Sequence, residues 1–559
     1  MHRIKSFLLR TFIILYAILC FSLAYFHLRV DQGHPSVSNS ELEKQERVKV
    51  ANDYYRIGPN WLRKNDWGLW EMHLEGNGYE RGLAHGKLSA ELMEYQEDAF
   101  VNKIFQLVPS ESYVRFLRGL IAWFNRDIEE NIPQEFKDEI YGISHSCNPK
   151  YNYIGPAYRR ILNYHAAHDI GHALQNLALV GCTSFALHQN TSDSNMLIGR
   201  NFDFYVSDQF AENKIVINVK PDSGYTFTYI SWASFIGVVS GMNEQGLTVT
   251  INAAKSEYPT KSAMPISLLA REILQYASNL DEAIAIAKTR NLFVSESIQV
   301  ASDQDNRSII IEKTSEATAV YSQDNSYLIC ANHFQSELLG STETNQKDMA
   351  EGPSVYRFKR CEQLIKERPQ ADYLQVAEIL RDTRGIDNQD IGMGNEKAMN
   401  QLISHHSIIF EPHKKRFWIS TSPYQLGDYL AYNMDDFKAF GSLQKSLQID
   451  SLRIPEDQDF NAEKYIQMSV YKDLKSELQT ALYQGKKLEN IYKISSDLIS
   501  SNPNYYYTYM LIGDYFYEHK DFKEAKYYYT ETLKYEIEHQ NSRIKINKRI
   551  KEIEEQYGK

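Results

Sequence analysis

The pair Gly181-Cys182 stands at the start of a run of strand-forming residues, 182–187, and its chemistry is suited to self-cleavage. The Cys182 thiol can attack the carbonyl carbon of Gly181, because glycine puts no side chain in its path. Hydrolysis of the resulting thioester would free the α-amine of Cys182. Such an amine has an ordinary pKa of about 8, so it can accept the proton of its own thiol. Nucleophile and base would then reside in one residue, and no catalytic histidine is needed.

Polar residues on later predicted strands could complete such a site. Arg200 and Asp203 are three residues apart and flanked by aromatic residues, so they could hold the thiolate and anchor the new α-amine. Asn252 and Asn332 end two further predicted strands. An asparagine amide at a strand end can donate to an oxyanion, which is worth about 3–4 kcal/mol in a preorganised site. Each residue alone is more often an ordinary turn or strand-end residue, so their combination is what favours catalysis.

Taken in order along the chain, these segments resemble the acyl-coenzyme A:6-aminopenicillanate acyltransferase family. That family is related to the choloylglycine hydrolases and penicillin V acylases of the N-terminal-nucleophile hydrolase superfamily. The resemblance covers roughly residues 60 to 430. It is carried by Gly76-Asn77-Gly78-Tyr79-Glu80-Arg81-Gly82 with His85-Gly86, Gly181-Cys182-Thr183-Ser184-Phe185, Gly199-Arg200-Asn201-Phe202-Asp203, Asn243-Glu244-Gln245-Gly246-Leu247, Asn332-His333-Phe334 and Ser354-Val355-Tyr356-Arg357.

The resemblance implies a role for each residue that matches a family motif. Cys182 would be the nucleophile, and the bond between Gly181 and Cys182 would be the one that is cut. Asp203 would be the partner of the new α-amine. Arg200 would polarise the thiol or bind the acyl group of the substrate.

Three further residues carry implied roles around the substrate. Asn252 and Asn332 match positions that build the oxyanion hole, although related enzymes vary at the first of them. Arg357 matches loosely and would contact substrate. The implied activity is cleavage of a carbon–nitrogen amide bond in a small N-acyl substrate through an acyl-cysteine, with no cofactor and no metal. Hydrolysis is favoured over acyl transfer, because transfer needs a second acceptor pocket that the sequence does not reveal.

The implied fold is α+β, a four-layer αββα sandwich in which two antiparallel sheets stack between helix layers. The residue pattern is mainly helical from 54 to 180 and then changes to short β-rich runs. Strands are expected at 182–187, 196–198, 214–219 and 227–230, and a hairpin at 236–239 and 247–251. Two helices, 266–277 and 281–288, and two strands, 297–301 and 308–312, should follow.

Five segments are expected along the 559 residues. Residues 1–30 are a signal peptide or signal anchor, and 31–50 a polar tether. Residues 51–181 form a mainly helical segment, and 182–458 the catalytic core that starts at the nucleophile. Residues 459–559 are helical, rich in Lys, Glu and Tyr, and nearly free of Gly and Pro.

The last segment resembles a tetratricopeptide repeat. Large residues, a glycine, aromatics and an alanine recur close to the repeat spacing, at Tyr509, Gly513, Phe516, Ala525, Tyr529 and Thr532. A simple helical hairpin is the alternative. One unit is too few for a free-standing solenoid, which needs at least about three repeats. The segment is therefore expected to pack on the main domain or on a protein partner.

The N-terminus predicts export. Arg3, Lys5 and Arg10 precede an uncharged run at 11–26, whose 16 residues fall short of the roughly 20 that a spanning helix prefers. Cleavage after Ala24 and retention as a signal anchor both remain open. The body of the protein is expected in the cell envelope, in the periplasm if the source is bacterial, with membrane contact only through this segment.

Charge and cysteine usage exclude several classes of function. The net charge of −11 argues against a nucleic-acid partner, since phosphate binding needs a basic surface. The five cysteines form no CxxC pair, so neither a disulfide framework nor a cysteine zinc site is indicated. Cys330 is interpreted as a small buried hydrophobic residue rather than a redox centre.

Two alternatives remain open. His165, His168 and His172 could present one helical face to zinc, but no acidic ligand completes a known zinc pattern, and a polar helix packed on the site is the favoured interpretation. The whole protein could also be a non-catalytic envelope protein that recruits partners through residues 459–559. The complete set of Cys182 and its companion residues argues against that second alternative.

Overall fold

The structure is a computed structural model that describes Tyr25 and residues 33–557, apart from 108–109, 174–178, 189–194, 256–261, 324–325 and 440–445. The predicted export segment therefore lies almost wholly outside the described residues. Among the helices that are described, none combines the length and the apolar character needed to cross a membrane.

The larger of two main sheets has eleven strands in the described chain. All neighbouring strands are antiparallel except β4 and β9, which run parallel. The order across the sheet is β1 (Val48–Ala51), β2 (Tyr54–Ile57), β3 (Asn60–Lys64), β4 (Trp70–Gly76), β9 (Ile215–Pro221), β10 (Phe227–Ser231), β11 (Ser240–Asn243), β12 (Leu247–Ala253), β13 (Glu296–Ser302), β14 (Arg307–Lys313) and β15 (Thr318–Tyr321).

The smaller sheet has six antiparallel strands and begins directly after Cys182. Its order is β16 (Tyr327–Cys330), β6 (Thr183–Leu187), β7 (Leu197–Phe202), β17 (His406–Glu411), β18 (Arg416–Ser420) and β19 (Tyr429–Asn433). A separate two-stranded ladder pairs β5 (Leu179–Val180) with β8 (Phe204–Tyr205). The residues just before the expected cleavage point thus pair with the segment that follows β7, and those just after it pair with β7 itself.

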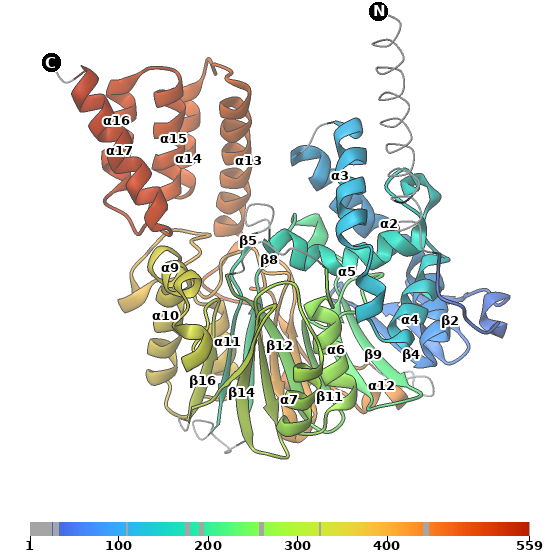
Figure 1. Ribbon diagram of the computed structural model, residues 1–559. Coiled ribbons are helices and arrows are strands. Elements are labelled where there is room, and N and C mark those ends of the chain that lie inside the picture. Colours follow the sequence, from blue (N-terminus) through green and yellow to red (C-terminus); the bar gives the residue numbers. More distant parts are fainter. Residues whose placement is uncertain are drawn as a thin grey trace, which may run out of the picture.

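The two main sheets face each other across an apolar layer, and helices cover their outer faces (Figure 1). Strand β6 shows how the sequence builds this arrangement. Ala186 packs between the sheets, whereas Phe185 and Leu187 pack against helices on the far side. Successive side chains of a strand point to opposite faces, so a strand with a layer on each face needs apolar residues throughout.

Helices on the outer face of the large sheet are α2 (Gly78–Leu107), α4 (Gln134–Ser144), α5 (Ala157–Ala173), α6 (Ile266–Tyr276) and α7 (Leu280–Thr289). Helix α3 (Glu111–Phe124) follows α2. The small sheet is covered by α10 (Ser354–Lys366) and α11 (Tyr373–Arg381). Shorter helices are α8 (Glu337–Gly340), α9 (Glu343–Glu351) and α12 (Asp436–Ala439).

The expected C-terminal helical segment is present and packs on the rest of the chain. It comprises α13 (Ala462–Gln484), α14 (Ile491–Ser501), α15 (Tyr506–Glu518), α16 (Phe522–Thr532) and α17 (Gln540–Tyr557). Asn461 caps the start of α13, and Gly485 ends it in the left-handed conformation. Leu402 and Leu426 of the sheet region join its apolar core. The tetratricopeptide assignment of α15 and α16 stays a prediction.

The structure differs from the sequence-based expectation in two places. Residues 236–239 were expected to form a hairpin strand, but the strand paired with β12 is β11, Ser240–Asn243. The backbone N–H of Ile236 donates to His165 and that of Val238 to Ser267, so helices α5 and α6 hold this run in an irregular conformation. In addition, β1–β4 belong to the large sheet although they precede Cys182, so the sheet core begins before residue 182.

Candidate active site

Cys182 lies in the turn between β5 and β6 and is only 1% exposed. Its Sγ is 3.8 Å from the backbone oxygen of Asp203. Burial raises the pKa of the Cys182 thiol to about 11, and the nearby positive charge of Arg200 opposes that rise. In the uncut chain the thiol is therefore neutral and closed to an external substrate. The Gly181 carbonyl is adjacent to Cys182 in the chain, so an attack by Sγ on it would close a five-membered ring.

The carbonyl of Gly181 is held by a side chain that the sequence did not single out. Gln401 Nε2 donates to this oxygen over 2.7 Å, and the Gly181 N–H donates to the backbone oxygen of Asp203 over 3.2 Å. A Cβ at position 181 would stand 2.5 Å from Gln401 Oε1, so a larger residue there would displace the Gln401 amide from this contact. Gln401 is thus placed to stabilise negative charge that develops on the Gly181 oxygen.

Asp203 presents a buried carboxylate beside the Gly181-Cys182 bond. Ser404 Oγ donates to one of its oxygens, and Gln401 Nε2 lies 3.4 Å from the other. Burial raises the pKa of Asp203 to about 7, whereas the Ser404 hydrogen bond and the charge of Arg357 favour the ionised form. The position suits the expected partnership with a Cys182 α-amine, since a new ammonium group would stabilise the carboxylate.

The raised pKa of Asp203 predicts a pH dependence of stability in the uncut chain. Between the unfolded pKa of 3.8 and the folded pKa of about 7, the native state retains a proton that the unfolded state has released. Stability must then fall as pH rises through this window, by about 4 kcal/mol at most. We expect Asp203→Asn in a Cys182→Ala background to lose this component. The check is urea unfolding of both variants from pH 4 to 8, where a constant difference in unfolding free energy would refute the shift.

Arg200 connects the two sheets. From β7 its guanidinium donates to the backbone oxygen of Val239 over 2.8 Å, to Ser240 Oγ and to the backbone oxygen of Ile251. The group is fully buried and lies 4.4 Å from the centre of the Phe202 ring. Burial lowers its pKa, and the neighbouring Cys182 and Asp203 oppose this effect. The charge is thus placed to stabilise a Cys182 thiolate, and binding of an acyl group by Arg200 stays a prediction.

The two candidate oxyanion residues meet near the end of β12. Asn252 Nδ2 donates to the backbone oxygen of Cys330 over 3.0 Å, and Asn332 Nδ2 donates to that of Ala253 over 2.8 Å. Each amide nitrogen carries a second hydrogen. Asn252 is completely buried, whereas Asn332 is partly exposed. Of the two, Asn332 is therefore better placed to meet a substrate.

Arg357 binds the backbone around the nucleophile. Its Nε donates to Thr183 Oγ1 over 2.7 Å, and Nη2 donates to the Cys182 oxygen over 3.4 Å and to Asn332 Oδ1. Its Nη1 donates to the backbone oxygen of Glu396 over 2.7 Å. These bonds all go to the protein, so Arg357 orients Cys182 and Asn332. Its expected contact with substrate stays a prediction.

The histidine helix shows no metal geometry in the part that the structure describes. His165 lies 2.8 Å from the Ile161 oxygen through Nδ1, and its Nε2 accepts from the Ile236 N–H over 2.9 Å. The side chains of His168 and His172 lie outside the described residues. Cys330 is fully buried, and burial raises its thiol pKa far above the usual range. That environment agrees with a structural role for Cys330.

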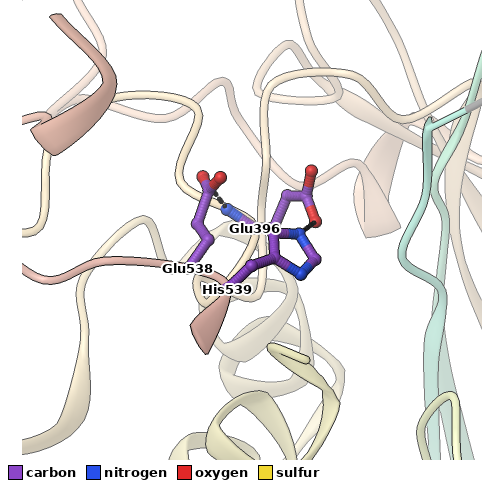
Figure 2. Close-up of side chains that lie close together, drawn as sticks. All are labelled: Glu396, Glu538 and His539. Atoms are coloured by element: carbon purple, nitrogen blue, oxygen red, sulfur yellow. Dashed lines mark hydrogen bonds and ion pairs between the residues drawn. The ribbon is translucent and has the colours of Figure 1, made fainter. Parts of the chain in front are cut away.

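Within the described chain, one group could supply ligands to a metal ion: Glu396, Glu538 and His539 (Figure 2). Several of their polar atoms already have protein partners. Glu538 accepts from the Glu396 N–H over 2.9 Å, and His539 Nε2 lies 3.0 Å from Glu396 Oε2. The Glu396 hydrogen bond raises the pKa of His539, and burial raises that of Glu538 to about 7. Each of the three residues thus has at least one protein hydrogen-bond partner.

A partly open pocket with a cavity volume of about 40 Å³ lies next to the strand that precedes Cys182. Its wall is mainly aromatic, formed by Phe100, Tyr164, Phe204, Phe210, Trp232 and Phe235. The backbone of Phe204 pairs with Val180, two residues before Cys182.

Glu97 lines the pocket too, but it is bound by Arg160 and Tyr164. Gln96 also lines the pocket, and it is 5% exposed. Its Oε1 accepts no hydrogen bond from any described residue.

Sequence comparison relates the chain to several curated proteins. It is 28% identical over 237 residues to an uncharacterized protein of Archaeoglobus fulgidus, covering 40% of this chain and 39% of the relative. It is 25% identical over 207 residues to the N-acylethanolamine-hydrolyzing acid amidase of Caenorhabditis elegans, and the match covers 35% of this chain and 56% of the amidase. It is 24% identical over 272 residues to protein dcd1B of Dictyostelium discoideum, and the match covers 45% of this chain and 52% of that protein. The chain thus spans about half or less of the length of these relatives.

Two solved structures are similar at low identity. One is the Caenorhabditis elegans ortholog of N-acylethanolamine-hydrolyzing acid amidase, with a TM-score of 0.30, 18% identity, and coverage of 41% of this chain and 93% of that one. The other is a mutant conjugated bile acid hydrolase from Clostridium perfringens, with a TM-score of 0.31, 16% identity, and coverage of 46% and 93%. Residues 189–422 match the family acyl-coenzyme A:6-aminopenicillanic acid acyl-transferase, in a range that begins after Cys182. This part of the chain is therefore similar to the acyl-coenzyme A:6-aminopenicillanic acid acyl-transferase family.

Proposed function

We propose that the protein is an N-terminal-cysteine amide hydrolase that activates itself by cutting the Gly181-Cys182 bond. The observation that carries this proposal is the environment of that bond. Gln401 holds the Gly181 oxygen and also lies 3.4 Å from the Asp203 carboxylate, the Asp203 backbone oxygen accepts from the Gly181 N–H, and Arg200 lies near the thiol. A buried cysteine with a purely structural role does not require such an arrangement around the preceding peptide bond.

In the proposed self-cleavage, Cys182 Sγ attacks the Gly181 carbonyl carbon through a five-membered ring. The thiol proton passes to the departing Cys182 nitrogen, and the C–N bond breaks to leave a thioester. Water then hydrolyses the thioester, which gives a Gly181 carboxylate and restores the thiol. Gln401 stabilises the oxyanion of the first step, and Asp203 stabilises the new ammonium group.

The same residue then acts on the substrate. The α-amine of Cys182 accepts the thiol proton, Sγ attacks the amide carbonyl, and the amine product leaves with that proton. Water hydrolyses the acyl-cysteine to a carboxylic acid. The second N–H of Asn332 is the proposed oxyanion donor, and Arg357 fixes both Asn332 and the Cys182 backbone.

The aromatic pocket supports an apolar acyl group as the part of the substrate that is bound. Aromatic side chains release much ordered water when they bind an alkyl or aryl chain, and charged groups gain nothing there. We further propose that the helix and sheet layers form the αββα sandwich of this superfamily and that the protein acts in the cell envelope, anchored or exported by its N-terminal segment.

The direct test offers the purified full-length chain a panel of N-acyl 4-nitroanilides with alkyl and aryl acyl groups. We expect release of 4-nitroaniline and of the free acid, and an acyl adduct on a peptide that begins at Cys182 after rapid acid quench. Mass spectrometry identifies both the adduct and the new N-terminus. A chain that stays uncut and releases neither product would refute the proposed function.

Gln96 should tune the choice of acyl group. The Gln96 oxygen has no donor among the described residues, so a hydroxyl on the acyl chain could gain a hydrogen bond there that a plain alkyl chain cannot make. We expect Gln96→Met to change the ratio of kcat/KM for alkyl over hydroxyalkyl acyl amides by about 5–10-fold in favour of the alkyl chain. An unchanged ratio would show that Gln96 does not contact the acyl chain.

A further inference from the structure

The loop of residues 390–404, which leads into β17, lies between the candidate site and the C-terminal helices. Its inner side carries three groups of the site. Gln401 holds the Gly181 oxygen, Ser404 donates to Asp203, and the backbone oxygen of Glu396 accepts from Arg357. A small movement of this loop would therefore displace the Gly181-Cys182 bond, the Asp203 carboxylate and Arg357 together.

The outer side of the 390–404 loop is held by the C-terminal segment. Asn502 exchanges two hydrogen bonds with the backbone of Met393, at 3.0 and 2.8 Å. Asn395 Nδ2 donates to the Glu536 oxygen over 3.1 Å, and Lys397 pairs with the Glu536 carboxylate over 2.5 Å. Leu402 joins the apolar core of the C-terminal helices.

Glu538 occupies the centre of this interface, in the connection between α16 and α17. Its buried carboxylate accepts from the Glu396 N–H and from the hydroxyls of Tyr505 and Tyr506, at 2.9, 2.9 and 2.8 Å. His539 holds the Glu396 side chain at the same time, as Figure 2 shows. Glu396 is therefore fixed through its N–H, its side chain and its carbonyl, and the carbonyl bond goes to Arg357.

We propose that the C-terminal helical segment braces the 390–404 loop and that Glu538 is a positioning residue of the active site. The connection runs from Glu538 through the Glu396 backbone to Arg357, and from there to Asn332 and Cys182. This inference rests on the proposed function and adds a role for the C-terminal segment within it. The segment then serves catalysis in its own chain, and recruitment of a partner is not needed to explain its presence.

The test compares four variants of the full-length chain. Glu538→Ala removes the acceptor of the Glu396 N–H, and Glu538→Gln keeps an oxygen there. His539→Ala releases only the Glu396 side chain. The His539 side chain is 43% exposed, so this substitution is expected to give a folded variant even if Glu538→Ala does not fold. Glu536→Gln is the matched control, because it breaks the Lys397 ion pair at the same interface and leaves the bonds of Glu396 intact.

We expect Glu538→Ala to lower kcat about 10-fold or more on the N-acyl 4-nitroanilide that the wild type hydrolyses best, with KM within about 3-fold. The reason is that Asn332 acts on the transition state, so its misplacement lowers kcat rather than substrate binding. His539→Ala should show the same pattern with a loss of about 3-fold. Glu538→Gln and Glu536→Gln should both stay within about 2-fold of wild type.

Hydrogen exchange supplies a second measurement that does not need activity. Peptides covering 393–404 and 329–336 should exchange about 10-fold faster or more in Glu538→Ala, or in His539→Ala if the former is unfolded, than in Glu536→Gln. Equal exchange and equal kcat in the folded variants and the control would overturn the brace. If the wild type hydrolyses no amide, the proposed function fails, and the exchange comparison alone then decides whether the brace exists.

Discussion

Replacing Cys182 by alanine is expected to leave the chain uncut and to lower amide hydrolysis by more than about 10⁴-fold. The change removes the only atom proposed to attack both the Gly181 carbonyl and the substrate, while the buried side chain shrinks by a single sulfur. Denaturing gel electrophoresis and intact-mass measurement report the cut, which should fall between residues 181 and 182 in the wild type. Liquid chromatography of the free acid reports hydrolysis.

Cys330→Ala is the matched control for this variant. Cys330 is also completely buried, and its backbone pairs with Ser184 of the same strand that follows Cys182. It has no role in the proposed chemistry, so its loss should reduce stability by an amount typical of a small cavity and leave cleavage intact. If Cys182→Ala is still cut at the same bond, or if both variants lose activity equally, Cys182 is not the nucleophile.

Asn332→Ala is expected to lower kcat by about 10²–10³-fold with little change in KM, the loss seen when one oxyanion donor is removed. Asn332 is partly exposed, and Arg357 holds its oxygen, which turns its amide nitrogen toward the end of β12. Steady-state kinetics on the best N-acyl 4-nitroanilide measure both constants. Cleavage of the Gly181-Cys182 bond should persist in this variant, because Gln401 holds the carbonyl in that step.

Asn279→Ala provides the same chemical change away from the site. Asn279 caps α7 and accepts from the Glu282 N–H over 3.0 Å, so its loss should cost about 1 kcal/mol of stability and leave kcat unchanged. A wild-type kcat in Asn332→Ala would move the oxyanion role to another donor. Loss of self-cleavage in Asn332→Ala would instead show that one oxyanion hole serves both reactions.

Part of the architecture could be predicted from the sequence because its signals are local. The strands at β6, β9, β10, β13 and β14 and the helices α6 and α7 lie within a few residues of their expected ranges. The run 236–239 was misjudged because its apolar residues look like a strand, yet its N–H groups bond to two helices that are far away in the chain. Periodicity reports burial, and it does not report which backbone groups pair.

By itself, the sequence singled out Cys182 among five cysteines and placed Arg200 and Asp203 beside it, because those residues fall in short contiguous motifs. Only the tertiary structure decided what holds them. Gln401 reaches Gly181 across 220 residues, Ser404 reaches Asp203 across 201, and Glu538 reaches Glu396 across 142. A single side-chain hydrogen bond between distant segments imposes no spacing on the residues around it. Such contacts therefore exist only once the sheets and the C-terminal helices have packed.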